Sequence, residues 1–288
     1  MIGWMDTIVQ GVLLGGLYAL FALGQSLIFG VMRLTNVAHG DFIILAAFAA
    51  FTFAGPLNIG PLGAFVFLLP LAVVFGYAMQ RLVLNGTLGK DPLPSLVVTF
   101  GLSIVIQNVL QEIFSADPRS IPAGELTTAS VRIVEGIAVG TLPLAIFVIA
   151  LLAAALLQWV FARTSVGRVF RATSDDRETA ELMGLDARVV YAAATALAFA
   201  LIALAGLLQG MRTTVAPTDG PALLLYAFEA VVIGGLGSFW GTFSGGIILG
   251  VTQAIGFRLD PGWGIWLGHV MFLVVLLVRP NGLFPKTR

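Results

Sequence analysis

The 288-residue sequence contains no cysteine, only two histidines and few charged residues. Without cysteine the chain forms no disulfide and offers neither a thiolate nucleophile nor a Cys-ligated metal site. The two histidines, His39 and His269, lie far apart, and no HExxH pattern is present, so no metal site is expected. A formal net charge of zero argues against a nucleic-acid partner, because such partners bind basic surfaces that neutralise phosphates.

The sequence also lacks the residue patterns of an enzyme. No GxxxxGK[ST] phosphate-binding loop is present, so this chain is not expected to hydrolyse ATP. Serine and threonine are scattered, and the acidic residues gather in one loop away from any candidate nucleophile. We therefore expect neither catalysis by this chain nor a cofactor bound to it.

Apolar residues and glycine dominate the composition instead. Hydrophobic residues make up 58% of the chain and charged residues 10%, and there are 34 glycines. A chain of this length has room for roughly eight to ten membrane helices of about 20 residues. Glycines in such helices permit close packing and broken helices. The predicted fold is an all-α polytopic membrane protein, with residues 1–288 forming a single transmembrane domain.

The gaps between charged residues predict about nine membrane crossings. The uncharged stretch 42–80 is too long for one helix, and the glycines and prolines of 55–61 divide it. Its first part is only marginally long enough to cross, so a half-helix buried in protein is an alternative. The expected helices are 8–29, 41–54, 62–80, 94–112, 138–161, 189–211, 223–235, 239–257 and 263–278.

Lysine and arginine are unevenly divided between the two sets of loops that nine crossings create. Eleven fall on the side of the loop 163–188 and four on the other side. Because positively charged loops stay in the cytoplasm, we expect this loop and the C-terminus to be cytoplasmic and the N-terminus to lie outside. The smaller set is Arg119, Arg132, Arg212 and Arg258, and the larger set includes Lys90, Lys286 and Arg288.

The loop 163–188 holds five of the fifteen basic and five of the fifteen acidic residues. Its sequence predicts one short helix. Asp175 is the expected N-cap, with Glu178 in the first turn, where the helix dipole favours negative charge. Gly184 is expected to end the helix after about two turns in the left-handed conformation.

Two distant segments resemble each other and indicate an inverted repeat. Residues 33–50 resemble 212–230 at an offset of 180 residues, at which Gly40, Leu45, Ala47 and Phe48 match Gly220, Leu225, Ala227 and Phe228. The predicted topology gives the helices before these segments opposite directions. In transporters such repeats place the pathway at their interface, beside interrupted helices. Chance similarity between two apolar segments is the alternative.

A pathway of this kind needs broken helices whose ends face a cavity. In the first half, Asn36, His39, Gly40 and Asp41 provide such a break, with Asn36 or Asp41 capping a helix start. The alternative is an ordinary cytoplasmic turn in which His39 is simply hydrogen-bonded. Glu229 lies in an apolar run, where an ionised carboxylate costs roughly 2.5–3.5 kcal/mol, so it should face a cavity or a partner on another helix.

The charged loop resembles a known family. ETAELMG at 178–184 is similar to the E-A-A-x-x-x-G motif of ABC importer permeases, with Thr179 in place of the first alanine. Its flanks, 167–176 and 184–190, look like the corresponding loop of branched-chain amino acid permeases. Residues 15–42, 227–250 and 279–284 follow the family's order and spacing, and the length is similar to that of the smaller of its two permease subunits.

This resemblance implies a subunit of an importer in the bacterial inner membrane. The implied partners are a second homologous permease, two cytoplasmic ATPases that bind ATP and magnesium, and a periplasmic or extracellular substrate-binding protein. Tyr226 stands where many relatives have lysine, which leaves the pathway lining open. The residues implied to couple to the ATPase are Gly167, Arg168, Arg171, Asp176, Glu178, Ala180 and Gly184.

The leading interpretation is a non-catalytic permease subunit for branched-chain or related amino acids. Relatives that carry urea or short amides leave these substrates as an alternative. An ion- or proton-coupled secondary transporter, with Glu229 and His39 as its titrating groups, is a second alternative. The residues assigned to the translocation pathway are Asn36, His39, Gly40, Asp41, Tyr226 and Glu229.

Overall fold

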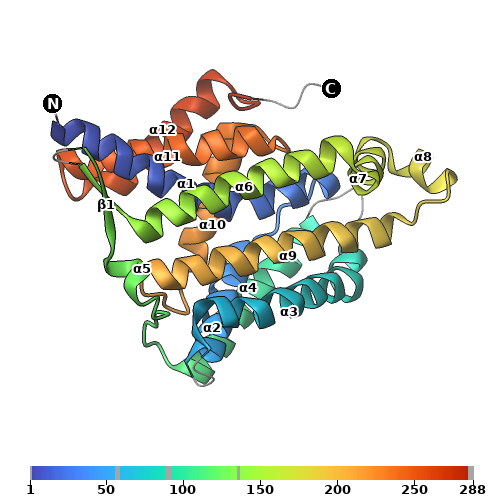
Figure 1. Ribbon diagram of the computed structural model, residues 1–288. Coiled ribbons are helices and arrows are strands. Elements are labelled where there is room, and N and C mark those ends of the chain that lie inside the picture. Colours follow the sequence, from blue (N-terminus) through green and yellow to red (C-terminus); the bar gives the residue numbers. More distant parts are fainter. Residues whose placement is uncertain (1, 56–58, 89–92, 135–136, 285–288) are drawn as a thin grey trace.

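A computed structural model describes residues 2–55, 59–88, 93–134 and 137–284, and shows a bundle of long helices (Figure 1). Five helices are long and apolar enough to cross a membrane alone, which confirms the predicted all-α polytopic membrane fold. Apolar residues cover their full circumference, so they form helices that are stable only when buried in protein or lipid. These five are α1 (Ile2–Met32), α3 (Gly60–Leu82), α4 (Leu93–Phe114), α6 (Thr141–Arg163) and α9 (Ala187–Arg212).

Four further apolar helices complete the predicted set. Two of them form a pair bent by 118°, which counts as a broken span or a re-entrant loop. The other two have 16 residues each, short of the usual length for a crossing. By length and composition, the described chain therefore has five or six spans. The four helices are α2 (His39–Ala54), α12 (Trp263–Val278) and the bent pair α10 (Gly220–Gly234) and α11 (Phe239–Leu259).

The described chain contains the nine apolar helices that the sequence predicted, but only five or six of them count as spans by length and composition, so nine crossings are not confirmed. At the end that holds the N-terminus, Arg258 Nη1 donates a hydrogen bond of 2.7 Å to the carbonyl of Gly3. At the opposite end, Ser174 Oγ donates to the carbonyl of Gly30, also at 2.7 Å. The nine apolar helices are α1, α2, α3, α4, α6, α9, α10, α11 and α12.

The C-terminal segment returns to the end of the bundle that carries the charged loop. The backbone amides of Leu283 and Phe284 donate to the carbonyls of Ile233 and Gly234, in the last turn of α10. The last carbonyls of a helix have no hydrogen-bond partner within that helix, and leaving them unpaired in a bilayer costs free energy. The C-terminal segment supplies the missing hydrogen-bond donors for α10. The start of α1 and the C-terminal segment up to Phe284 therefore lie toward opposite ends of the bundle, and their predicted orientation in the membrane stays a prediction. Lys90, Lys286 and Arg288 lie outside the described residues.

Helices α2 and α10 run across the long helices, and their first turns meet inside the bundle (Figure 1). A Cβ atom added to Gly40 would collide with the backbone of Gly220 and lie 2.6 Å from the amide nitrogen of Leu224. From this junction α2 leads toward Arg119, whose guanidinium lies over the Phe51 ring. Helix α10 leads instead toward the C-terminal segment. The predicted half-helix is thus observed twice, and we call this contact the α2–α10 junction.

The packing follows an inverted repeat. At the predicted offset of 180 residues, the ranges of α1, α2 and α3 coincide closely with those of α9, α10 and α11. Helix α1 packs along α11, and its counterpart α9 packs along α3. The end of α1 and the start of α9 lie at the same end of the bundle, so equivalent helices run in opposite directions. The arrangement favours a true repeat over chance similarity.

Outside the membrane-spanning part, the structure differs from the sequence expectation in the segment 115–140 and in the charged loop, which contains two helices. The segment 115–140, expected to lead irregularly into a helix at 138, contains a short helix and an antiparallel hairpin that pairs Val131 with Val139. The alternating β-branched residues of this segment explain the hairpin. The remaining elements are η1 (Leu84–Thr87), α5 (Glu125–Thr128), β1 (Ser130–Val134), β2 (Ile137–Gly140), α7 (Ser165–Asp175) and α8 (Arg177–Leu182).

We predict that Gly40→Ala destabilises the protein, because the added methyl group would force the α2 and α10 backbones apart. Overpacking of this kind typically costs about 1–3 kcal/mol. Gly101→Ala is the matched control, since no atom lies within 4 Å of a Cβ added to this helical glycine. Thermal melting of the purified protein should show a lower midpoint for Gly40→Ala alone. Equal midpoints for the two variants would contradict the close approach.

Candidate functional site

The α2–α10 junction brings together the four residues assigned to the first helix break. Two helix N-termini meet there, and each carries roughly half a positive charge from its aligned peptide dipoles. The buried carboxylate of Asp41 lies against Gly220, the first residue of α10, and so faces both positive ends. Its Oδ1 also accepts a hydrogen bond of 2.9 Å from Gln107 Nε2 on α4. The negative charge of Asp41 therefore offsets the electrostatic repulsion between the positive N-terminal ends of α2 and α10.

Asn36 and His39 hold the chain that leads into α2. The side-chain oxygen of Asn36 accepts a hydrogen bond from the backbone amide of Ala38 at 3.1 Å. The cap position itself is Ala38, without a side-chain cap, so neither Asn36 nor Asp41 caps α2 as predicted. Asp41 instead lies in the first turn, because α2 starts at His39, three residues before the start that an N-cap at Asp41 would give.

His39 is fully buried inside the bundle. Its Nε2 lies 2.8 Å from the carbonyl of Phe21, and its Cε1 lies close to Gly24 on α1. The imidazole therefore donates this hydrogen bond through Nε2. The expectation that His39 is hydrogen-bonded is confirmed, but the residue lies in the protein interior and not in a cytoplasmic turn.

Tyr226 and Glu229 lie on α10, beyond the junction. The ring of Tyr226 stacks on Tyr18 of α1, with 4.8 Å between ring centroids. The Tyr18 hydroxyl donates a hydrogen bond of 2.6 Å to Gln253 Oε1 on α11. Glu229 Oε1 pairs with His269 Nδ1 on α12. These contacts form a polar cluster shared by four helices.

The pair of Glu229 and His269 supplies the partner that the sequence required for a buried carboxylate. Glu229 is almost fully buried, whereas 34% of the His269 side chain is exposed at the surface of this chain. Placing these groups on separate helices fixes the position of α12 on α10. Sequence reasoning missed Tyr18, Gln107 and Gln253 as polar members of the interior, although each is a hydrogen-bonding residue in an apolar run.

The charged loop contains two helices where the sequence predicted one. Helix α7 folds back tightly on α6, because a Cβ atom at Gly167 would lie 2.5 Å from the Cα atom of Phe161. Thr164 caps α7 by accepting a hydrogen bond of 3.1 Å from the amide of Gly167. The buried ring of Phe170 packs on Phe161, and Ser174 bonds to the end of α1. Helix α7 is thus fastened to the bundle along its length.

Helix α8 projects beyond α7 and is capped at both ends (Figure 1). Its N-cap is Asp176, not Asp175 as predicted, because α7 extends through Asp175. The Asp176 carboxylate accepts hydrogen bonds from the amide and hydroxyl of Thr179, at 3.1 and 2.6 Å. These hydrogen bonds lower the pKa of Asp176 below its ordinary value, so the carboxylate that caps α8 stays charged to a lower pH than that of an unpaired aspartate.

The structure confirms the prediction that Gly184 ends this helix in the left-handed conformation. Its φ of +88° is in the left-handed region, which glycine adopts without a steric penalty. The amide of Leu185 donates to the carbonyl of Ala180 at 3.1 Å, and that of Gly184 donates to Glu181 at 3.0 Å. This pattern is a Schellman cap. The backbone of the buried Ala180 thus helps to close the helix that Asp176 begins.

The tip of α8 carries two apolar residues that the sequence reasoning did not select. Leu182 and Met183 are 87% and 80% exposed. Exposed apolar pairs on a rigid projection are typical of contact surfaces. Glu178, Arg168 and Arg171 are also at least partly exposed, and the side chains of the two arginines form no hydrogen bond or ion pair within the described chain. Their predicted bracing role stays a prediction.

Comparison with known families decides what kind of protein has this arrangement. Residues 7–279 match the family model described as branched-chain amino acid transport system / permease component. The chain belongs to this family. The family assignment supports an ABC-type permease and gives no support to the alternative of a secondary transporter built on Glu229 and His39.

Individual permeases are similar over nearly their full length. BraD of Pseudomonas aeruginosa, a permease of high-affinity branched-chain amino acid transport, is 28% identical, covering 98% of this chain and 96% of the relative. LivH of Escherichia coli, with the same described role, is 26% identical over the same shares. The fructose import permease FrcC of Rhizobium meliloti is 31% identical over 72% of this chain and 62% of its own length.

A solved structure shares the fold of this permease. A chain of PsaBC from Streptococcus pneumoniae, solved in complex with Fab, superposes with a TM-score of 0.51 at 15% identity. The superposition covers 98% of this chain and 97% of that chain. Similarity of the overall fold therefore extends over nearly the whole chain.

We predict that Glu229 and His269 are energetically coupled. The single variants Glu229→Gln and His269→Asn and the double variant form a thermodynamic cycle, measured by denaturation of the purified permease. Groups in direct contact typically give coupling energies of roughly 0.5–3 kcal/mol. The same cycle between Glu229 and Thr52, which hydrogen-bonds only within α2, provides a control near zero. Additive effects in the first cycle would contradict a pair that fastens α12 to α10.

Proposed function

We propose that this permease is the membrane-spanning subunit of an ATP-driven importer for branched-chain or related amino acids. The observation that carries the proposal is the loop 163–188, which forms a firm projection at the end of the bundle opposite the N-terminus. A projection that is capped at both ends and fastened at its base transmits force without bending. Such a structure suits a subunit whose energy comes from another protein.

In this proposal a cytoplasmic ATPase seats on α8. Leu182 and Met183 enter an apolar recess of that partner, and the charged residues around them, with Glu178 foremost, form the polar rim. Gly167 and the Thr164 cap hold α7 against α6, so displacement of α8 moves α6 and the start of α9. Two ATPases, which bind ATP and magnesium, serve two permease subunits, and a second homologous permease completes the membrane part.

The pathway assignment rests on the polar cluster and the α2–α10 junction. Asn36, His39, Gly40 and Asp41 stiffen the start of α2, whereas Tyr226 and Glu229 lie on the side of α10 near His269. Motion of α10 relative to α12 would change the exposure of these groups. A substrate-binding protein outside the cell delivers the solute, which is consistent with an N-terminal end directed outward. The substrate class is taken from the relatives named for branched-chain amino acids.

We predict that Gly184→Val abolishes most ATP-dependent uptake while the protein still inserts. A β-branched residue is strongly disfavoured at a φ of +88°, so the C-terminal cap of α8 would open. Gly86→Val is the matched control, because Gly86 lies at the same end, also has no atom within 4 Å of an added Cβ, and has no left-handed φ. Uptake of radiolabelled leucine into cells would be measured. Unchanged uptake in Gly184→Val would count against the coupling role.

We also predict that Leu182→Ser weakens the association with the ATPase. Loss of one apolar side chain from a buried contact costs about 1.5–3 kcal/mol, or more than tenfold in affinity. Leu82→Ser is the control, because Leu82 is 83% exposed and lies near the same end on α3. Co-purification of the nucleotide-hydrolysing partner provides the measurement. Equal recovery of the ATPase with both variants would mean that its binding site lies elsewhere on the permease.

A further inference from the structure

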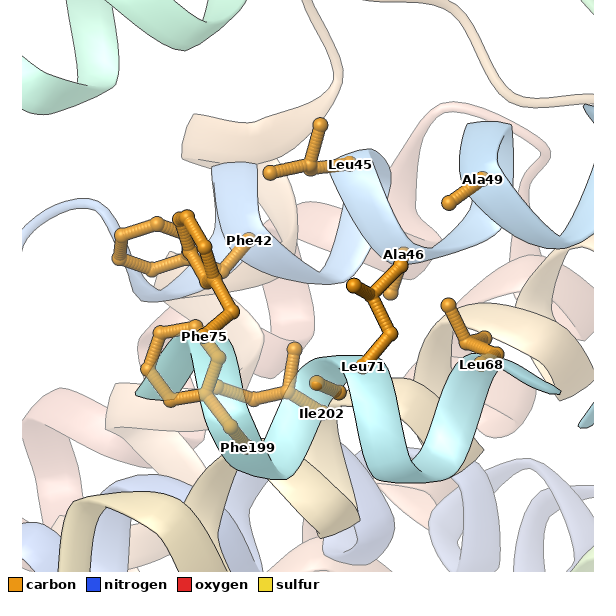
Figure 2. Close-up of a pocket in the computed structure, with 10 residues that line it drawn as sticks. Phe42, Leu45, Ala46, Ala49, Leu68, Leu71, Phe75, Phe199 and Ile202 are labelled. Atoms are coloured by element: carbon orange, nitrogen blue, oxygen red, sulfur yellow. The ribbon is translucent and has the colours of Figure 1, made fainter. Parts of the chain in front are cut away.

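A cavity of about 210 Å³ lies between α2, α3 and α9, next to the α2–α10 junction (Figure 2). Its walls are formed by alanine, leucine, isoleucine and phenylalanine side chains alone. Figure 2 shows α2 on one side of the space and α3 on the other, with Phe42, Phe75 and Phe199 gathered at one end. The lining residues are Phe42, Leu45, Ala46, Ala49, Leu68, Leu71, Ala72, Phe75, Phe199 and Ile202.

The lining excludes polar occupants. None of the ten side chains carries a charge or a hydrogen-bonding group, so neither a zwitterionic amino acid nor water finds a partner there. An apolar cavity of about 150 Å³ in another protein stays dry and binds benzene. The larger cavity here favours an apolar ligand, since an unfilled space of this size loses dispersion contacts along all its walls.

The cavity opens beside α3, the long helix whose surface is least covered by the rest of this chain. Leu71 at its edge is 52% exposed and is continuous with the apolar surface that Phe67 and Val74 form on α3. Only 22% of the membrane-spanning window of α3 is buried within this chain, the smallest share among the five long helices. Hydrocarbon tails of the bilayer lie against such a surface, and a neighbouring tail can enter without leaving the apolar phase.

We propose that this cavity binds an acyl chain of a membrane phospholipid. A bilayer lipid is favoured over a free fatty acid, because no basic side chain lines the cavity to hold a free carboxylate. The head group stays at the membrane surface while the end of one tail fills the space. Binding then depends on tail contacts and not on the identity of the head group.

The position of the cavity gives the bound tail a structural effect. Phe42 directly follows Asp41, and its ring packs on Phe199, with 4.8 Å between centroids. Phe75 packs on the same ring from α3 at 5.6 Å. A tail that fills the remaining space supports the first turn of α2 on the side opposite to α10. The lipid is thus part of the packing that holds the junction.

The experiment uses the full-length permease in its own membrane. Cells are grown with a fatty acid that carries a photoactivatable diazirine near the end of its chain, so that the probe enters the phospholipids. After irradiation, the permease is purified with its partners, and labelled residues are located by peptide mass spectrometry. Labelling is expected at Phe42, Leu68, Phe199 and Ile202, which line the cavity and are only 2–3% exposed.

Two variants with the same added ring separate cavity binding from general lipid contact. Ala72→Phe fills the space and should reduce labelling of the four buried residues severalfold. Val74→Phe, on the same helix but 66% exposed, should leave it unchanged. If Ala72→Phe does not fold, Ala49→Phe fills the cavity from α2 at a partly exposed position.

Three results would overturn the proposal. Labelling confined to exposed residues such as Val74 would mean that tails touch only the outer surface. Equal labelling of the buried residues in Ala72→Phe and Val74→Phe would mean that the probe arrives by another route. Protection of the cavity by a cross-linked second permease, or by added leucine, would identify a different occupant. None of these readouts depends on the proposed transport function.

Discussion

The contact between the starts of α2 and α10 is the constraint on which the rest of the bundle depends. Two broken helices leave unpaired backbone groups in the interior, and a bilayer offers no water to satisfy them. Gly40 and Gly220 let the two backbones come close enough for protein to surround these groups. Asp41 supplies the negative charge between two positive helix ends, and Gln107 holds that carboxylate from α4. A substitution that separates the two helices would therefore disturb both halves of the repeat at once.

The charged loop is subject to a different constraint, because its short helices must be kept rigid in water. A helix of six residues is unstable in isolation, since its few internal hydrogen bonds do not offset the cost of nucleation. Asp176 at the start and Gly184 at the end compensate for this short length. Helix α7 adds a base that is tied to α6 through Gly167 and to α1 through Ser174. The exposed pair Leu182 and Met183 is thereby held in a constant position relative to the membrane helices.

The sequence alone was sufficient to locate the nine apolar helices, because their limits are set by local signals such as charges, glycines and prolines. It also located the break at 33–41, the repeat at 212–230 and the left-handed Gly184. It misplaced the N-cap by one residue, since Asp175 and Asp176 are equivalent by type and only the length of α7 distinguishes them. It gave no indication that Tyr18 meets Gln253, or that His269 meets Glu229. Such contacts join positions 40 or more residues apart and depend on how helices rotate against one another.

Helices of one repeat pack mainly against helices of the other repeat, and this has a consequence for how the chain folds. Helix α1 buries its length against α11, and α3 against α9, whereas α1 makes little contact with the adjacent α2. Each half consequently leaves its longest apolar surfaces uncovered until the other half is present. About 70 residues, from Phe114 to Ala187, separate the end of α4 from the start of α9. During synthesis the first four helices are therefore in the membrane before their partners in the second repeat have been made. Fragments produced by cutting within α6 would thus be expected to form native structure only when both are inserted together.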